Sequence, residues 1–227
     1  MSVELLREAG RNLADRLVRR TFRPTIVIAV PRRGIVVGHE IARRLRLPLD
    51  VILATKVFGP GQHPVAIGAV ALGGVLLTDP GLLTAAIPED DRDRRFHEAT
   101  AALEDRLAAL RGDAPLPELR GHRVLLVDDA VVTGLTATAA VEAIAARDPT
   151  EVMVATALCG TEGAIRLSER EIELIAHDLA PTPAAAHRHA HAAAEISITD
   201  DDVRDLIADA QRSAGADLYQ GLEIDGV

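Results

Sequence analysis

The segment from Val124 to Thr136 holds the residue types and the spacing best suited to chemistry in this chain. Four apolar residues lead into two adjacent carboxylates, Asp128 and Asp129, and a Thr-Gly-Leu-Thr turn and an alanine-rich stretch follow. This order predicts a buried strand, an acidic tip, a tight turn and a helix N-terminus. Helix N-termini bind anions through backbone N–H groups, and paired carboxylates accept hydrogen bonds from sugar hydroxyls or hold Mg²⁺ through water. The segment therefore predicts a phosphate site beside a diol site; the alternative is an ordinary strand end with an Asp helix cap.

Positive charge is expected near this site from two other segments. Arg32 and Arg33 lie between an apolar strand and Gly34, which opens a helix. Guanidinium groups suit phosphate oxygens, and glycine lets the backbone approach a ligand closely. Lys56 is the only lysine in the chain, and it offers a compact charge on a flexible stem. The alternatives are two solvated surface arginines and a lysine present by chance.

The apolar periodicity predicts alternating strands and helices, which is typical of an α/β fold with a parallel sheet flanked by helices. Ligands of such sheets bind outside the carboxyl ends of the strands, where the loops after Val30, Val57 and Val127 would meet. Both carboxylates can face one ribose only if the motif strand ends at Val127, because adjacent strand residues point to opposite faces. His177 and Asp178 are expected to follow the last strand and to reach the site. The expected helices cover residues 3–20, 34–45, 90–110, 137–147, 162–170 and 201–210. The 90–110 helix is long and charged with one apolar stripe, and Thr199 or Asp200 is expected to cap the last helix. The expected strands cover residues 25–30, 49–57, 66–71, 75–78, 123–127, 151–158 and 171–175, and those over 66–71 and 75–78 are expected to form a hairpin.

The composition indicates a single cytoplasmic domain that spans residues 1–227. A net charge of −9 argues against a general nucleic-acid surface, and no apolar run is long enough to span a bilayer. Residues 1–20 lack the apolar core of a signal peptide, and a single cysteine, Cys159, excludes a disulfide framework. Hence we expect neither a nucleic acid nor a membrane as a partner.

The segment from Val124 to Thr136 resembles the phosphoribosyl-pyrophosphate (PRPP) motif of type I phosphoribosyltransferases, in which an apolar run, two acidic residues and a Thr-Gly-x-Thr turn follow one another. The resemblance implies the type I phosphoribosyltransferase fold, with a small hood and a flexible β-hairpin loop. It also implies that Asp128 and Asp129 bind the ribose hydroxyls and, through water or PRPP, Mg²⁺. The 5′-phosphate would be bound by the loop of Val132, Thr133, Gly134, Leu135 and Thr136.

Two more segments carry the resemblance. The Pro-Arg-Arg-Gly loop is similar to the family's short pyrophosphate loop, which implies that Arg32, Arg33 and Gly34 bind the diphosphate. Residues 55–70 resemble a subgroup of uncharacterised bacterial phosphoribosyltransferase-like proteins, in which a lysine ends a strand before a Gly/Pro-rich loop. In similar proteins Lys56 would contact the diphosphate, and the loop would close over the reacting centre to exclude water.

Residues 178–200 form a variable hood segment, in which related chains usually carry several aromatic residues. Here the segment is rich in alanine and histidine, and the whole chain holds only three Phe and one Tyr. The acceptor is therefore left open between a nucleobase and another small nucleophile. His187, His189 and His191 would share one face of an extended strand and suit a metal, but a solvated flexible stretch is the favoured alternative.

These expectations together predict a PRPP-dependent phosphoribosyltransferase, a pentosyl-transferring enzyme that releases pyrophosphate. The reaction would pass through an oxocarbenium-like state, as in glycosyl transfer generally. Arg32, Arg33, Lys56 and Mg²⁺ would neutralise the leaving diphosphate, and Asp129 is a candidate general base for the acceptor proton. Many similar proteins are homodimers, and the same is expected here.

Other functions are weighed against this prediction. The set of Arg32, Lys56, Asp128 and Asp129 favours catalysis, whereas the loss of hood aromatics leaves room for a non-catalytic regulatory protein that binds PRPP or a nucleotide. A PRPP hydrolase and a transferase for a non-base acceptor are further alternatives. No Walker A motif and no Gly-x-Gly-x-x-Gly motif is present, so the sequence does not support a P-loop or a dinucleotide-binding domain.

Overall fold

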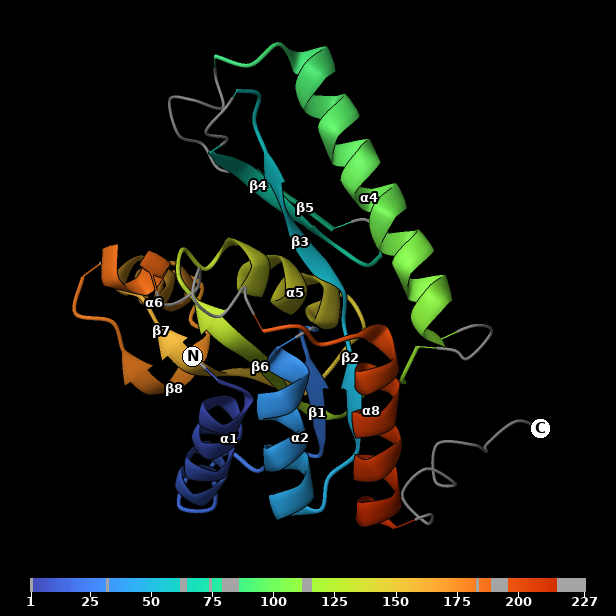
Figure 1. The fold of residues 1–227 in the computed structure, drawn as a ribbon, viewed down its shortest axis with the longest axis vertical. Coiled ribbons are helices and arrows are strands. Elements are labelled where there is room, and N and C mark those ends of the chain that lie inside the picture. Colours follow the sequence, from blue (N-terminus) through green and yellow to red (C-terminus); the bar gives the residue numbers. More distant parts are fainter. Residues whose placement is uncertain are drawn as a thin grey trace.

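The computed structural model of the chain describes residues 2–31, 33–61, 65–73, 75–78, 86–111, 116–182, 184–188 and 196–215. Two β-sheets form its framework: a five-stranded parallel sheet, and a three-stranded antiparallel sheet that lies above it in Figure 1. The parallel sheet has the strand order β2-β1-β6-β7-β8. Its strands are β1 (Ile26–Ala29), β2 (Leu49–Val51), β6 (Arg123–Val131), β7 (Glu151–Cys159) and β8 (Glu173–Leu179).

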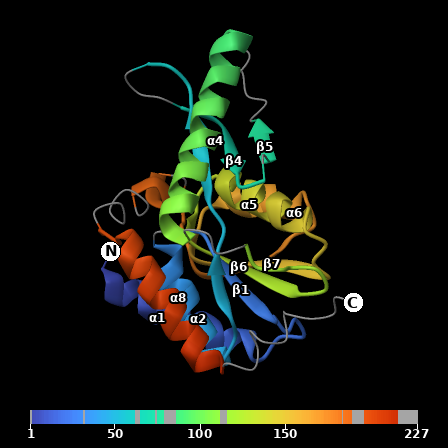
Figure 2. The same ribbon diagram turned by 90° about the vertical axis from the view of Figure 1, so that its right-hand side faces the viewer.

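Helices cover both faces of the parallel sheet (Figure 2). One face carries α1 (Val3–Leu17), α2 (Gly34–Leu45) and α8 (Asp200–Ala214), and the other carries α5 (Leu135–Ala145) and α6 (Thr161–Ser168). Alternate strand residues supply the two cores: Val27 and Leu125 belong to the first, and Ile28 and Leu126 to the second. Strands buried on both faces read as continuous apolar runs, which is the pattern seen in the sequence. The predicted α/β class, with a parallel sheet flanked by helices, is confirmed.

The remaining elements form an antiparallel layer, which consists of β3 (Ala54–Phe58), β4 (Ala66–Ala71), β5 (Val75–Thr78) and the helix α4 (Glu89–Arg111). Strands β4 and β5 make the predicted hairpin. The long charged helix is also confirmed, and the side chains of its apolar stripe that are buried are Phe96, Leu103 and Leu110. Helix α4 packs along β3 and β4. One face of the antiparallel sheet is therefore covered by the helix of the same layer.

The expected single strand over residues 49–57 is wrong, because the chain forms two strands that belong to different sheets. Strand β2 pairs with β1 in parallel, and β3 pairs with β4 in antiparallel orientation. The amide of Ile52 still donates to the Ala29 carbonyl at 3.0 Å, after which the chain leaves the parallel sheet. An apolar run carries no information about which partner strand it meets, so the sequence pattern could not reveal this break.

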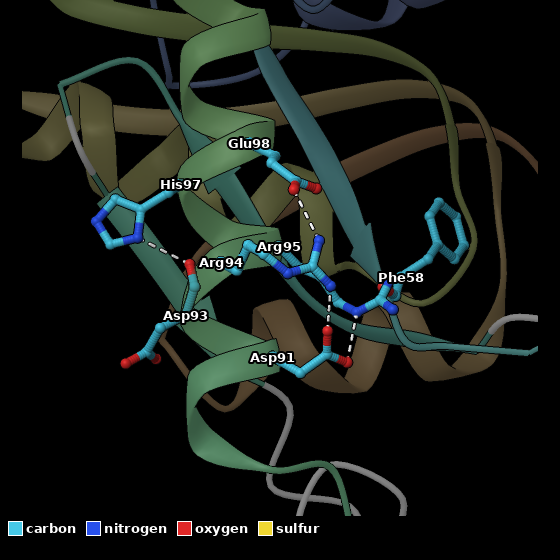
Figure 3. A network of polar contacts seen from close by, with 7 residues as sticks. All are labelled: Phe58, Asp91, Asp93, Arg94, Arg95, His97 and Glu98. Atoms are coloured by element: carbon cyan, nitrogen blue, oxygen red, sulfur yellow. Dashed lines mark hydrogen bonds and ion pairs between the residues drawn. The ribbon is translucent and has the colours of Figure 1, made fainter.

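Polar contacts tie the first half of α4 to the end of β3 (Figure 3). Arg94 is ion-paired to both Asp91 and Glu98 along the helix. Arg95 donates to Asp91 at 3.0 Å and to the Phe58 carbonyl at 3.4 Å. Because Phe58 ends the strand β3, the helix helps to hold that strand in place.

Two strand ends in the parallel sheet differ from the expectation. Strand β6 continues to Val131, and Ala130 and Val131 still pair with β7, so the expected end at Val127 is wrong. Strand β8 covers 173–179 rather than 171–175 because its pairing with β7 begins at Glu173. The predicted cap of the last helix is confirmed, since Thr199 forms a reciprocal capping box with the third helical residue.

The hood segment 178–200 is described only in part. Residues 184–188 are helical, and residues 183 and 189–195 lie outside the described residues. The single-domain organisation over residues 1–227 stays a prediction. Within the described residues, no helix is long and apolar enough to cross a membrane.

A buried ion pair joins the two layers. Asp50 on β2 binds Arg111 at the end of α4, and one of the two hydrogen bonds measures 2.9 Å. Both side chains are only 12 % exposed. Removing one partner of such a pair takes away compensation from the charge that stays buried, which is destabilising.

We expect Asp50→Asn to lower the free energy of unfolding by about 3 kcal/mol, because the Arg111 charge would stay buried. Urea unfolding measures this change. Asp15→Asn is the matched control: its pair with Arg44 is exposed, and exposed pairs contribute about 1 kcal/mol or less. Equal losses in both variants would contradict the structural role of the Asp50 pair.

Candidate functional site

The candidate site lies where β1 and β6 meet the start of α2. The helix begins at Gly34, and Arg33 precedes it. Arg33 Nε donates to Asp129 Oδ2 at 2.8 Å and so joins the helix start to β6. A Cβ atom on Gly34 would lie 3.0 Å from the Val127 carbonyl oxygen and 3.1 Å from Asp128 Cα. Such distances are tighter than most real Cβ contacts, so glycine lets α2 start this close to the strand.

The carboxylates Asp128 and Asp129 are each only 7 % exposed. Although β6 continues past both, both lie at the Arg33–Gly34 turn. Asp129 bonds to Arg33, and Asp128 Oδ1 is 3.5 Å from the point where a Gly34 Cβ would stand. Because β6 continues to Val131, the condition that the strand ends at Val127 is not met. Asp128 lines a pocket together with residues 130–137, and Asp129 bonds to Arg33.

Burial raises the pKa of Asp128 well above its usual range, and the neighbouring charge of Asp129 raises it further. The Asp129 amide, which donates to Asp128 Oδ1 at 2.8 Å, and the charge of Arg33 act in the opposite direction. Buried carboxylates are costly unless cations or hydrogen-bond donors compensate them. The pair is thus suited to bind hydroxyl groups or a hydrated cation.

The 132–136 loop leads from β6 into α5. Gly134 has a φ of +79°, a left-handed conformation that glycine adopts without the steric cost of a Cβ. The Thr133 hydroxyl is buried and has no hydrogen-bond partner among the described residues. Together with Lys56 and Asp128, residues 130–137 line one small pocket. The predicted phosphate loop therefore shares one pocket with Asp128, which is one of the two carboxylates of the predicted diol site.

Lys56 reaches this pocket from the other sheet. It lies within β3, opposite Ala69 of β4 and two residues before the strand ends at Phe58. Burial lowers the pKa of Lys56, while the charges of Asp128 and Glu162 raise it in part. The ammonium group thus faces the carboxylate across the pocket, and a cation from the antiparallel layer meets an anion from the parallel sheet.

The structure brings most of the predicted residues together: Arg33, Gly34, Lys56, Asp128, Asp129, Val132, Thr133, Gly134, Leu135 and Thr136. Arg32 lies outside the described residues. Sequence reasoning missed two residues of α6. Glu162 influences the pKa of Lys56, and Arg166 Nε donates to the Thr133 carbonyl at 2.8 Å. Gly160, Gly163 and Arg166 follow one another at three-residue intervals. This spacing is the signal in the sequence that could have indicated a role for these residues at the site.

A second cavity, of about 480 Å³, lies at the carboxyl ends of β7 and β8. Its lining includes Glu8 of α1 and the pair His177 and Asp178. This pair lies within β8 rather than after it, and it lines this cavity rather than the Lys56 pocket, which corrects the expectation. In the register of the parallel sheet, Asp129 of β6 lies opposite Ala157 of β7, and Ala157 lies opposite His177 of β8. Because Ala157 also lines the cavity, the cavity begins one strand away from the carboxylate pair.

The histidine-rich segment is described only at its start. His187 is exposed and belongs to the helical residues 184–188, so it does not meet the condition of an extended strand. His189 and His191 lie outside the described residues. Among the residues that are described, no group of three or more His, Cys, Asp or Glu side chains could hold a metal ion.

Residues 3–179 match the family model of the phosphoribosyl transferase domain. The chain therefore belongs to this family, and the predicted resemblance to type I phosphoribosyltransferases is confirmed.

Two kinds of relative agree with this assignment. The crystal structure of TT1426 from Thermus thermophilus superposes with a TM-score of 0.68 at 30% sequence identity, covering 90% of this chain and 96% of that chain. Rv0571c and MT0597, from two strains of Mycobacterium tuberculosis, bear phosphoribosyl transferase as a provisional name. Each is 32% identical over 149 residues, which cover 65% of this chain and 34% of the relative. The match thus spans about a third of the length of these relatives.

The raised pKa of Asp128 makes its charge unfavourable for folding. A carboxyl whose folded pKa exceeds its unfolded value of about 3.9 stabilises the fold fully below that value and loses this contribution as pH rises through the folded pKa. Asp128→Asn removes the charge and keeps an Oδ1 acceptor for the Asp129 amide. We therefore expect Asp128→Asn to have a higher free energy of unfolding than wild type at pH 8.

Urea unfolding across pH 4 to 8 measures this difference, which should shrink towards pH 4. Asp148→Asn is the control, because Asp148 pairs with Arg120 at an exposed position. If wild type is as stable as Asp128→Asn at every pH, the destabilising effect assigned to the buried Asp128 charge is contradicted.

Proposed function

We propose that the protein is a PRPP-dependent phosphoribosyltransferase, which joins C1 of the 5-phosphoribosyl group to a small nucleophile and releases pyrophosphate. The observation that carries the proposal is one pocket lined by the Asp128 carboxylate, the Lys56 ammonium and the 132–136 loop. PRPP presents a phosphate, vicinal hydroxyls and a diphosphate, and these groups match the loop amides, the carboxylates and the cations in turn. Membership of the phosphoribosyl transferase domain family supports the same reaction.

In the proposed reaction, the C1–oxygen bond to the diphosphate breaks and a bond from C1 to the nucleophile forms. The 132–136 loop binds the 5′-phosphate, and Asp128 and Asp129 accept hydrogen bonds from the ribose hydroxyls. Their negative charge stabilises the oxocarbenium-like carbon. Lys56 and the Arg32–Arg33 pair neutralise the departing diphosphate. Asp129 takes the proton that the nucleophile loses.

Mg²⁺ belongs to this proposal. The electrostatics of the carboxylate pair supports it, because burial and mutual repulsion raise the pKa of Asp128, and a hydrated divalent cation would relieve both. We propose that Asp128 and Asp129 hold the ion indirectly, through water or through PRPP. Bound there, the ion would neutralise charge on the diphosphate.

We propose that the acceptor binds in the cavity lined by Glu8 and His177, one strand away from Asp129. Its described lining holds two carboxylates and one imidazole, and no Phe, Tyr or Trp side chain is among these lining residues. Stacking on aromatic rings is a common way to bind a base, whereas charges and hydrogen bonds suit an amine. A small amine therefore fits this cavity better than a stacked nucleobase.

A non-catalytic regulator that binds PRPP or a nucleotide is the second candidate function. The lack of Phe, Tyr and Trp side chains in the described lining of the acceptor cavity favours it, because a regulator needs no acceptor. A homodimer, a cytoplasmic location and the absence of a nucleic-acid partner stay predictions.

Calorimetric titration of PRPP with Mg²⁺ into wild type, Asp128→Asn, Asp129→Asn and Lys56→Met tests the proposal. We expect wild type to bind, and each variant to bind at least about tenfold more weakly, since hydrogen bonds to charged groups contribute about 1.5–3 kcal/mol each. Asp148→Asn should bind like wild type. Pyrophosphate release across a panel of amines and bases then separates a transferase from a regulator, which would bind PRPP without acceptor-dependent release. No binding by wild type would contradict both functions.

The acceptor cavity is tested by Glu8→Gln and His177→Ala. We expect each variant to raise the KM for the acceptor about tenfold and to leave the Kd for PRPP unchanged, because neither residue lines the Lys56 pocket. Steady-state pyrophosphate release at varied acceptor concentration measures the effect. A change in PRPP affinity with an unchanged acceptor KM would contradict this placement.

A further inference from the structure

Helix α6 and its N-cap, Gly160, bond to three consecutive carbonyl groups where β6 passes into the 132–136 loop. The Gly160 amide donates to the Val131 carbonyl at 2.9 Å, and the Gly163 amide donates to the Val132 carbonyl at 2.9 Å. Arg166 Nε then donates to the Thr133 carbonyl at 2.8 Å. Gly163 and Arg166 stand three residues apart, a spacing that places them on one face of α6.

This contact decides which way the loop amides point. In a planar trans peptide the N–H of each residue points opposite to the preceding carbonyl. The amides of Val132, Thr133 and Gly134 therefore point away from α6. Within the described part of the chain, none of these three amides donates a backbone hydrogen bond. Val132, Thr133 and Gly134 line the pocket together with Lys56 and Asp128.

Three glycines, which have no Cβ atom, allow the loop to lie this close to α6. A Cβ on Gly163 would come within 2.6 Å of the Val131 carbonyl oxygen, and a Cβ on Gly160 within 2.8 Å of the Val132 oxygen. A Cβ on Gly134 would lie 3.2 Å from both Cβ and Cδ of Arg166. The stem of Arg166 thus packs on the loop while its guanidinium binds a loop carbonyl.

We propose that Arg166, together with Gly160 and Gly163, positions the 132–136 loop for phosphate binding. This inference rests on the proposed function, since the loop is the site that would take the 5′-phosphate. The three residues touch no reacting atom. They hold the carbonyls against α6 and so keep the amides directed at the pocket before the ligand arrives, which lowers the conformational cost of binding.

The test compares Arg166→Met, which keeps the stem and removes the donor, with Arg166→Lys, which keeps a donor. For Arg166→Met we expect the Kd and the KM for PRPP to rise about tenfold, with kcat at saturating PRPP within about twofold of wild type. Arg166→Lys should recover part of the affinity. Calorimetry with Mg²⁺–PRPP and steady-state pyrophosphate release give both quantities.

Controls separate positioning from general stability. Arg170→Met changes an arginine that lies just after α6 and pairs with Glu142 at 3.6 Å. Glu162→Gln removes the 3.7 Å ion pair to Arg166. Urea unfolding of Arg166→Met should match that of Arg170→Met, and Glu162→Gln should not reproduce the full loss of PRPP affinity. Gly163→Ala, which forces the loop away from the helix, should weaken PRPP binding at least as much as Arg166→Met.

The outcomes are distinguishable. No PRPP binding by wild type would overturn the proposed function. If wild type binds PRPP, an Arg166→Met or Gly163→Ala variant with wild-type affinity would overturn the positioning role alone. A fall in kcat with an unchanged PRPP affinity would overturn it as well, because the loop carbonyls lie on the phosphate side of the site and not at the reacting carbon.

Discussion

Two carboxylates buried side by side are the constraint on which the rest of the structure depends. Asp128 and Asp129 lie at the carboxyl edge of a parallel sheet, where burial and mutual repulsion raise the pKa of Asp128. Every nearby element supplies compensation: α2 begins with Arg33 bonded to Asp129, and β3 brings Lys56 towards Asp128. The remaining electrostatic cost would be relieved by the hydroxyl groups and the hydrated cation of the proposed ligand.

The antiparallel layer has a mechanical as well as a chemical role. It carries Lys56 on a strand rather than on a loop, and a strand holds a side chain more rigidly. The layer is itself fastened to the parallel sheet by the buried Asp50–Arg111 pair and to its own helix by Arg95. The distance between Lys56 and the carboxylates is therefore set by contacts that lie well outside the pocket.

The loop between β6 and α5 illustrates how backbone donors are prepared for a ligand. Helix α6 bonds the carbonyls of Val132 and Thr133, and among the described residues the first three amides of the loop donate no backbone hydrogen bond. Unpaired buried polar groups cost free energy in a folded protein, and the buried Thr133 hydroxyl without a partner among the described residues is a further example. Such a cost is typical of sites where binding is favoured over stability.

The sequence alone determined the elements whose signals are local. The bounds of α2, the hairpin, the Thr199 cap and the carboxylate–loop motif all follow from apolar periodicity and turn chemistry within a dozen residues. Only the tertiary structure decided the split of the predicted 49–57 strand, the extension of β6 past Asp129, the place of His177 in β8 and the contact of Arg166 with the loop. The physical reason is that strands end where their partners end, and hydrogen-bond partners far apart in the chain leave no periodic trace in either segment.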